Sequence, residues 1–150
     1  MRTTLLLWLL ALASGALIPV QAAANAALSK SIGNNVAFAA LALFVVAGAT
    51  ALFAVVLLGA RIPPMGALRA APTWSYVGGL IVAAYVLTIT FLVPRLGVGT
   101  AISFIVTGQI AAALVIDHFG LLRSLTVPLT PVRMLGAALM VAGVFLALRR

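Results

Sequence analysis

Five long apolar segments, separated by proline, glycine and charged residues, limit what this chain can fold into. They cover about residues 3–28, 36–59, 74–93, 98–117 and 132–148. A helix that crosses the hydrocarbon core of a bilayer needs about 20 apolar residues, within a range of roughly 17–25. Each segment reaches that range. The sequence therefore predicts an all-α membrane protein, a bundle of about five transmembrane helices in a single transmembrane domain over residues 1–150.

The composition agrees with a membrane location. Hydrophobic residues make up 65% of the chain and charged residues 7%, whereas soluble domains contain roughly 45–50% and about 25%. Nine Lys and Arg against one acid give a formal charge of +8. These basic residues flank the apolar segments and form no cluster, which is typical of membrane proteins rather than of nucleic-acid binding. We therefore expect a lipid bilayer and no nucleic acid among the partners.

The chain is poor in groups that perform acid–base or metal chemistry. It has no cysteine, and its only acid and only histidine are the adjacent Asp117 and His118. One copy therefore cannot supply a carboxylate pair, a carboxylate–imidazole metal cluster, or a catalytic triad with further acid–base groups. We expect no enzyme activity, no cofactor and no metal site.

The breaks between the segments predict the connections. Gly33 suits a helix C-cap and Asn35 an N-cap, and residues 61–72 are expected to form a loop. The turn at residues 94–97 is short enough to require a tight helical hairpin. Residues 119–131 are too broken to continue the fourth helix, and Thr130 with the following proline is typical of a helix start.

The N-terminal segment has two interpretations. Arg2, an apolar run and the small residues around Ala22 also fit a cleaved signal peptide. The longer uninterrupted span and its series of polar residues favour a retained transmembrane helix. Both interpretations remain open on the pattern alone.

The charge distribution gives little information on orientation. Five spans place the following basic residues on the N-terminal side: Arg2, Arg61, Arg69, Arg123 and Arg133. The opposite side has Lys30, Arg95, Arg149 and Arg150. Cytoplasmic loops normally carry a clear excess of Lys and Arg, and the excess here is one residue. Insertion in both orientations, with antiparallel pairing of two copies, is therefore one prediction, and a single orientation with the N-terminus inside is the other.

Polar residues within the first segment fall on one face. Ser14, Gln21 and Asn25 lie within about 60° of one another at 100° per residue, and Pro19 beside them predicts a kink that frees a backbone carbonyl. Polar groups inside a membrane mark candidate substrate sites. The alternative is that Gln21 and Asn25 hydrogen-bond to a neighbouring helix.

Three other features add candidates. Gln109 and Tyr85 are predicted to contact substrate, with helix packing as the alternative for each. Asp117 and His118 can both exchange protons, and they are predicted to handle protons. At the end of a helix, Asp117 can instead pair with an arginine such as Arg123 or hold local structure.

Three stretches together resemble one known family, the small five-helix branch of the drug/metabolite transporter superfamily, whose members are inner-membrane exporters. The stretches are GALIPVQAAANAAL from Gly15, the residues from Pro72 to Leu122, and PVRMLGAALMVAGVFL from Pro131. They include the VPRLG turn, the Gly108-Gln109 pair and the DHFGLL run. The resemblance covers nearly the whole chain, and in that family the first helix is retained.

The resemblance implies a transporter in a bacterial inner membrane that moves a small polar or amphiphilic solute by alternating access. The unit would contain ten helices, with this chain as one half. Its partner is then a second copy, parallel or antiparallel, or a paralogous chain. A related branch uses a carboxylate in helix 1 to exchange protons for cations, and this helix 1 has none. The alternative function is a non-transporting assembly partner of a larger membrane complex.

Overall fold

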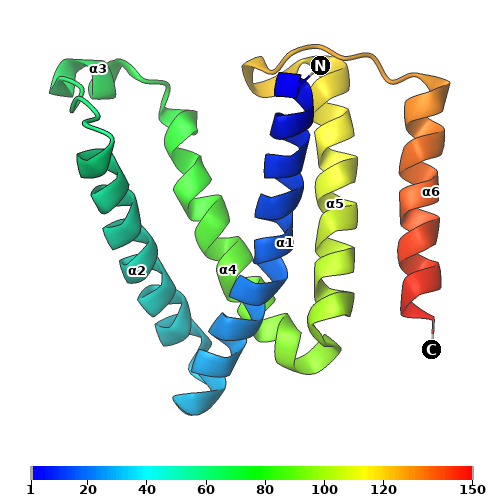
Figure 1. Cartoon of the computed structure of the whole chain (residues 1–150), viewed down its shortest axis with the longest axis horizontal. Helices are drawn as coiled ribbons and strands as arrows, with labels where there is room; N and C mark the ends of the chain where they lie inside the picture. Colours follow the sequence, from blue (N-terminus) through cyan, green and yellow to red (C-terminus); the bar gives the residue numbers. More distant parts are fainter. Residues whose placement is uncertain (1, 150) are drawn as a thin grey trace. The chain divides into compact units, whose positions relative to one another are not determined.

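The computed structural model describes residues 2–149, and every regular element in them is helical (Figure 1). The elements are α1 (Arg2–Ser31), α2 (Val36–Leu57), α3 (Met65–Ala70), η1 (Thr73–Tyr76), α4 (Val77–Leu96), α5 (Val98–Phe119), η2 (Leu121–Arg123) and α6 (Pro131–Leu148). The predicted all-α membrane fold is confirmed.

Within residues 2–149, four stretches of helix are long and apolar enough to cross a membrane. They are Thr4–Ser31, Val36–Leu57, Thr73–Leu96 and Val98–Phe119. The apolar part of α6, Pro131–Leu146, is shorter. All of α6 has 18 residues, which at 1.5 Å per residue rise about 27 Å. That length is close to the hydrocarbon thickness of about 30 Å.

The caps predicted from the sequence are present. The Asn35 side chain accepts a hydrogen bond from the Phe38 N–H at 3.0 Å, and Gly33 has a left-handed φ of 77°. Thr130 caps α6 by accepting from the Arg133 N–H at 3.3 Å, with proline in the first turn. These side chains satisfy backbone N–H groups that have no partner within their own helix.

One expected loop contains a helix. Residues 61–72 include α3, which begins directly after Pro64. The Pro63-Pro64 pair ends the preceding helix, but the six residues MGALRA contain no further proline and include good helix formers. The Tyr76 hydroxyl donates to the Leu68 carbonyl at 2.8 Å and ties α3 to the start of the next helix. The proline pair therefore ends one helix without preventing the next, and the prediction of a continuous loop was wrong.

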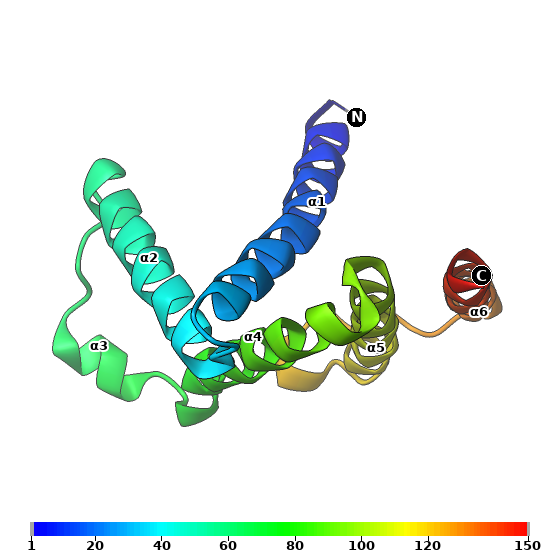
Figure 2. The ribbon, with the colours of Figure 1, turned by 90° about the horizontal axis from the view of Figure 1, so that it is seen from below.

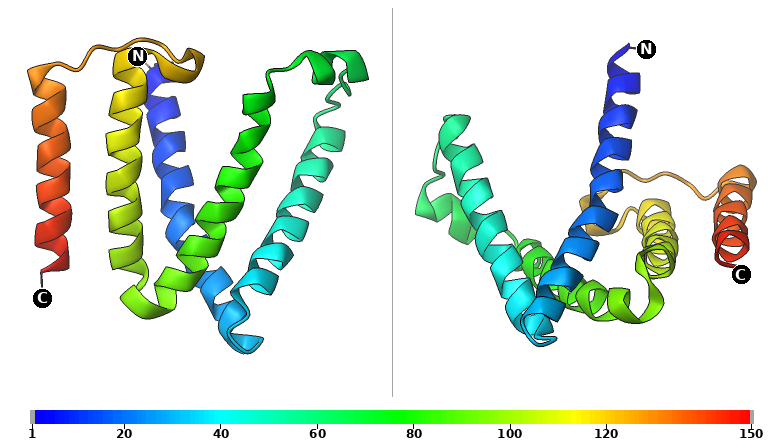
Figure 3. Two further views of the ribbon diagram at one scale, coloured as in Figure 1. Left: turned by 180° about the vertical axis from the view of Figure 1, so that it is seen from behind. Right: turned by 60° about the horizontal axis from the view of Figure 1, so that its bottom comes forward.

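The chain divides into two compact units, residues 1–95 and 96–150. In the first unit, α1 and α2 are joined at the turn after Ser31 and diverge from it (Figure 2). α4 crosses the C-terminal half of α1 (Figure 3). Small side chains are buried on α1 and α2, namely Ala22, Ala26, Ala39 and Ala40. Larger side chains are buried on α4, namely Val86, Ile89 and Val93. Small residues allow helix backbones to approach closely in a membrane.

The second unit is an α5–α6 helix pair. α5 and α6 lie side by side and run in opposite directions (Figure 1). The rings of Phe104 and Phe145 meet edge to face with centroids 6.3 Å apart. Aromatic pairs prefer this arrangement.

Most large apolar side chains of both units point outward. Leu12 is 71% exposed and Val56 is 72% exposed, for example. A soluble monomer rarely leaves so much apolar surface in water. In a bilayer the same surface contacts lipid or another membrane helix, which agrees with the predicted environment.

Candidate functional site

A groove of about 420 Å³ lies between α1 and α2. Its lining residues are Gln21, Ala24, Asn25 and Leu28 from α1 and Ala42, Leu43, Val46 and Ala47 from α2. The α1 residues are spaced at i, i+3, i+4 and i+7, which places them on one helix face. Six of the eight lining residues are Ala, Leu or Val, so the walls are mainly apolar. The amides of Gln21 and Asn25 are the polar side-chain groups.

Asn25 is only 4% exposed, and its Nδ2 donates a hydrogen bond to Thr90 Oγ1 on α4. For Asn25, the alternative predicted from the sequence, a hydrogen bond to a neighbouring helix, is therefore confirmed. An asparagine amide has two N–H donors and a carbonyl oxygen, so one bond leaves further capacity. Asn25 both holds α4 against α1 and lines the groove.

Gln21 lies one turn before Asn25 and is half-buried. Among the described residues, no hydrogen bond joins its side chain to another group of the chain. A primary amide without a partner in a membrane-spanning helix is costly. Gln21 is therefore the polar group of the groove best placed to bind a solute.

Pro19 is within α1, as the sequence predicts, and it is half-buried. Its ring nitrogen has no N–H, so the Gly15 carbonyl lacks its usual donor four residues later. Ser14 is exposed and does not line the groove. Of the predicted polar face, the structure brings together Gln21 and Asn25 in the groove.

On α4, Tyr85 is half-buried and lies outside the groove. Thr90, the partner of Asn25, was not among the residues predicted from the sequence. The missed signal was the i, i+3, i+4, i+7 pattern of Val86, Ile89, Thr90 and Val93, all buried. A threonine on an otherwise apolar buried face needs a polar partner from another helix.

Gln109 lies on α5 in the second unit and is exposed. On the same helix, the Thr107 hydroxyl donates to the Ser103 carbonyl at 2.9 Å. This local bond satisfies the Thr107 hydroxyl within its own helix, as threonines in membrane helices commonly do. Gln109 remains the predicted polar contact of α5.

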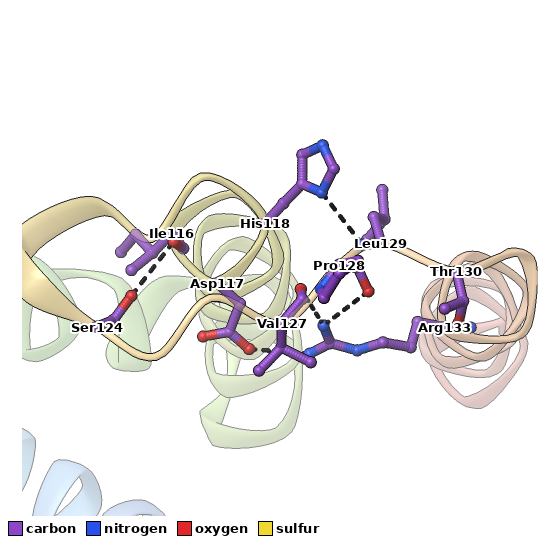
Figure 4. A network of polar contacts seen from close by, with 9 residues as sticks. All are labelled: Ile116, Asp117, His118, Ser124, Val127, Pro128, Leu129, Thr130 and Arg133. Carbon is purple, nitrogen blue, oxygen red and sulfur yellow. Dashed lines mark hydrogen bonds and ion pairs between the residues drawn. The ribbon is translucent and has the colours of Figure 1, made fainter.

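Asp117 forms an ion pair at the end of α5. Arg133 Nη2 lies 2.8 Å from Asp117 Oδ2 (Figure 4). The same guanidinium donates through Nη1 to the Val127 carbonyl at 2.8 Å. The arginine that pairs with Asp117 is therefore Arg133, from the start of α6, rather than Arg123 as the sequence analysis suggested.

His118 and the backbone around Asp117 hold the same loop. The Leu129 N–H donates to His118 Nδ1 at 3.1 Å, and Ser124 Oγ donates to the Ile116 carbonyl at 3.3 Å (Figure 4). The Val127 N–H donates to the Asp117 carbonyl at 2.9 Å. These contacts give Asp117 and His118 a structural role in the α5–α6 connection, and proton handling by them stays a prediction.

Residues 2–149 contain no group of three or more His, Cys, Asp or Glu side chains that could hold a metal ion. The polar groups of the α1–α2 groove are amides, which bind solutes through hydrogen bonds without taking up or releasing protons at neutral pH. The amides of this groove are therefore suited to reversible binding of a solute through hydrogen bonds.

Long apolar helices and an apolar groove with two amide side chains are the features of a polar-lined membrane helix bundle. The family described as "Putative inner membrane exporter, YdcZ" matches residues 6–146, which include most of α1. The chain belongs to this family, and the resemblance noted from its sequence is confirmed. Membership supports a transporter rather than an enzyme. No curated protein and no solved structure matches the chain.

Proposed function

We propose that this chain exports a small polar or amphiphilic solute by alternating access, with the α1–α2 groove as part of the substrate path. The observation that carries the proposal is the half-buried amide of Gln21, which has no hydrogen-bond partner among residues 2–149 and lies in a mainly apolar groove of about 420 Å³. Small-molecule sites are commonly apolar clefts with a few polar groups that fix orientation.

Charge favours a neutral or zwitterionic amphiphile. The first unit has no Asp or Glu, and the only acid of the chain is paired with Arg133 in the second unit. A cation in the groove would therefore lack a counter-charge, and an unpaired ion in a membrane is costly. A solute with an apolar body and a hydrogen-bonding group matches the groove walls and the Gln21 amide.

Two chains would form the complete transporter. Many transporters contain two inverted halves that rock around a central site, and the five-to-four distribution of basic residues fits insertion of this chain both ways. The partner is a second copy or a paralogous chain. In this proposal Ser14, Tyr85 and Gln109 line other parts of the substrate path.

Replacing Gln21 by leucine tests the groove. Efflux of the neutral amphiphile Nile red from preloaded cells is expected to fall about tenfold, which corresponds to about 1.4 kcal/mol of lost binding, the size of one hydrogen bond to a buried amide. Membrane expression and thermal stability should be unchanged, because Gln21 has no partner within the described chain. Fluorescence decay after energising the cells measures the efflux.

The matched control is Ala23→Leu, an added apolar side chain at an exposed position of the same helix outside the groove. Equal efflux by Gln21→Leu and wild type would remove Gln21 from the substrate path. No efflux by the wild type, together with co-purification of a different chain, would instead favour the assembly-partner alternative.

Topology reporters at the C-terminus test the pairing. One reporter is active only inside the cell and the other only outside. Both fusions are expected to give signal, because an excess of one basic residue gives only a weak preference for one orientation. Signal from a single fusion would require a parallel dimer or a separate partner chain.

A further inference from the structure

A second groove, of about 460 Å³, lies between the start of α5 and the end of α6. Its lining residues are Thr100 and Phe104 from α5 and Phe145, Leu146, Leu148 and Arg149 from α6. The two helices run in opposite directions, so the N-terminus of α5 and the C-terminus of α6 meet at one end of the unit (Figure 1). None of these residues belongs to the α1–α2 groove.

The inner part of this groove is apolar. Phe104 and Phe145 meet edge to face, yet 53% and 63% of their surfaces remain exposed. Leu146 continues the same surface and is also exposed. An acyl chain can lie along such a wall, since it exchanges bulk lipid contacts for contacts with rings and methyl groups.

One positively charged side chain, Arg149, lies at the outer end of the groove. Arg149 is exposed at the C-cap of α6. Facing it, α5 begins at Gly97, which offers no capping side chain. The first backbone bond of α5 runs from the Ala101 N–H to the Gly97 carbonyl at 3.1 Å. The N–H groups of Val98, Gly99 and Thr100 precede that bond and have no carbonyl partner within α5. The carbonyl end of α6 offsets the positive end of α5, so Arg149 supplies the net positive charge.

The Thr100 hydroxyl can donate into this end of the groove. Thr107, two turns later, donates to a carbonyl of its own helix. Thr100 lies in the first turn of α5, where the carbonyl four residues earlier belongs to the preceding helix. Within residues 2–149, no hydrogen bond from the Thr100 hydroxyl to another group is found.

We propose that this groove binds one anionic phospholipid, with its phosphate between Arg149 and Thr100 and an acyl chain along Phe104 and Phe145. Guanidinium and hydroxyl groups both donate to phosphate. A free phosphate would leave the apolar wall unused. A second copy of this chain offers Arg149 only one acidic side chain, Asp117, which is paired with Arg133.

The test is native mass spectrometry of the full chain in detergent, with phosphatidylglycerol and phosphatidylcholine of identical acyl chains. The wild type is expected to retain phosphatidylglycerol preferentially. Arg149→Gln should reduce this preference about fivefold, the usual effect of one basic residue on an anionic lipid. Thr100→Val should reduce it less. The control Arg123→Gln removes an exposed arginine of the same unit that does not line the groove, and it should retain the wild-type preference.

Three results would overturn the proposal. Equal retention of the two lipids by the wild type would mean that charge is not recognised. An equal loss of preference in Arg149→Gln and Arg123→Gln would mean that net charge, not the groove, attracts the lipid. Displacement of bound lipid by an equal concentration of inorganic phosphate would mean that the acyl chain contributes nothing.

Discussion

Replacing Asn25 by leucine is expected to lower the free energy of unfolding of the first unit by about 2–4 kcal/mol. Two effects add. Loss of the bond to Thr90 costs about 0.6 kcal/mol, the average for hydrogen bonds between membrane helices. The larger side chain must also fit beside the buried Ala22 and Ala26, and overpacking typically costs about 1–3 kcal/mol. Packing is therefore the larger contribution.

Thr90→Val separates the two contributions. Valine has the shape of threonine without the hydroxyl, so this variant removes the hydrogen bond and leaves the packing nearly unchanged. Its expected cost is only about 0.6 kcal/mol. Unfolding in mixed micelles, followed by circular dichroism, measures both variants. If Asn25→Leu destabilises the protein no more than Thr90→Val does, the prediction that overpacking beside Ala22 and Ala26 is the larger contribution is contradicted.

The buried position of Asn25 also affects how the substrate site can be tested. A leucine at this position would reduce transport by disturbing the helix packing, whether or not Asn25 contacts solute. Gln21, one turn away, has no partner in the described chain and can be replaced without that effect. The two amides look equivalent in the sequence, and their different burial makes Gln21 the informative one.

The helices were predictable because their causes are local. Apolar length fixed the spans, and the Asn35 and Thr130 caps depend on side chains within three residues of the groups they bind. The short helix α3 was missed because proline ends a helix but does not prevent another from starting after it. α1 continues to Ser31, three residues past the predicted end. The residues after Leu28 include no proline that would end the helix there.

The site was predictable only in part. A spacing of four residues places Gln21 and Asn25 on the same face of α1, and both line one groove in the structure. The opposite wall consists of Ala42, Leu43, Val46 and Ala47, which look like any other apolar residues of α2. The partner of Asn25 is 65 residues away, and helix periodicity contains no information on which helices meet.

An arginine partner for Asp117 was one of the alternatives, but the particular arginine was missed for a related reason. Arg123 is six residues from Asp117 and looked like the natural partner, whereas Arg133 is 16 residues away. The chain turns back between them because the loop is bonded to the end of α5 through Val127 and Leu129. That return brings the first turn of α6 to the carboxylate (Figure 4).

Arg133→Gln is accordingly expected to destabilise the second unit by about 1–2 kcal/mol. The side chains of the Arg133–Asp117 pair are 30% and 35% exposed. A fully exposed pair contributes about 0–1 kcal/mol, and breaking a buried pair costs about 3–5 kcal/mol, so a half-buried pair lies between. The variant also loses bonds to the Val127 and Pro128 carbonyls. Thermal unfolding measures the loss, and faster tryptic cleavage after Arg123 should report the released loop.

Asp117→Asn completes the comparison and tests the predicted proton-handling role. If the carboxylate only pairs with Arg133, this variant should lose stability and the double variant should lose little more, because both changes break one interaction. Arg123→Gln, which breaks no hydrogen bond found in the structure, should stay within about 0.5 kcal/mol of wild type.

If Asp117 instead moves protons, Asp117→Asn should abolish efflux while a stable Arg133→Gln protein retains it. Equal stability of Arg133→Gln and wild type would contradict the structural role of the ion pair.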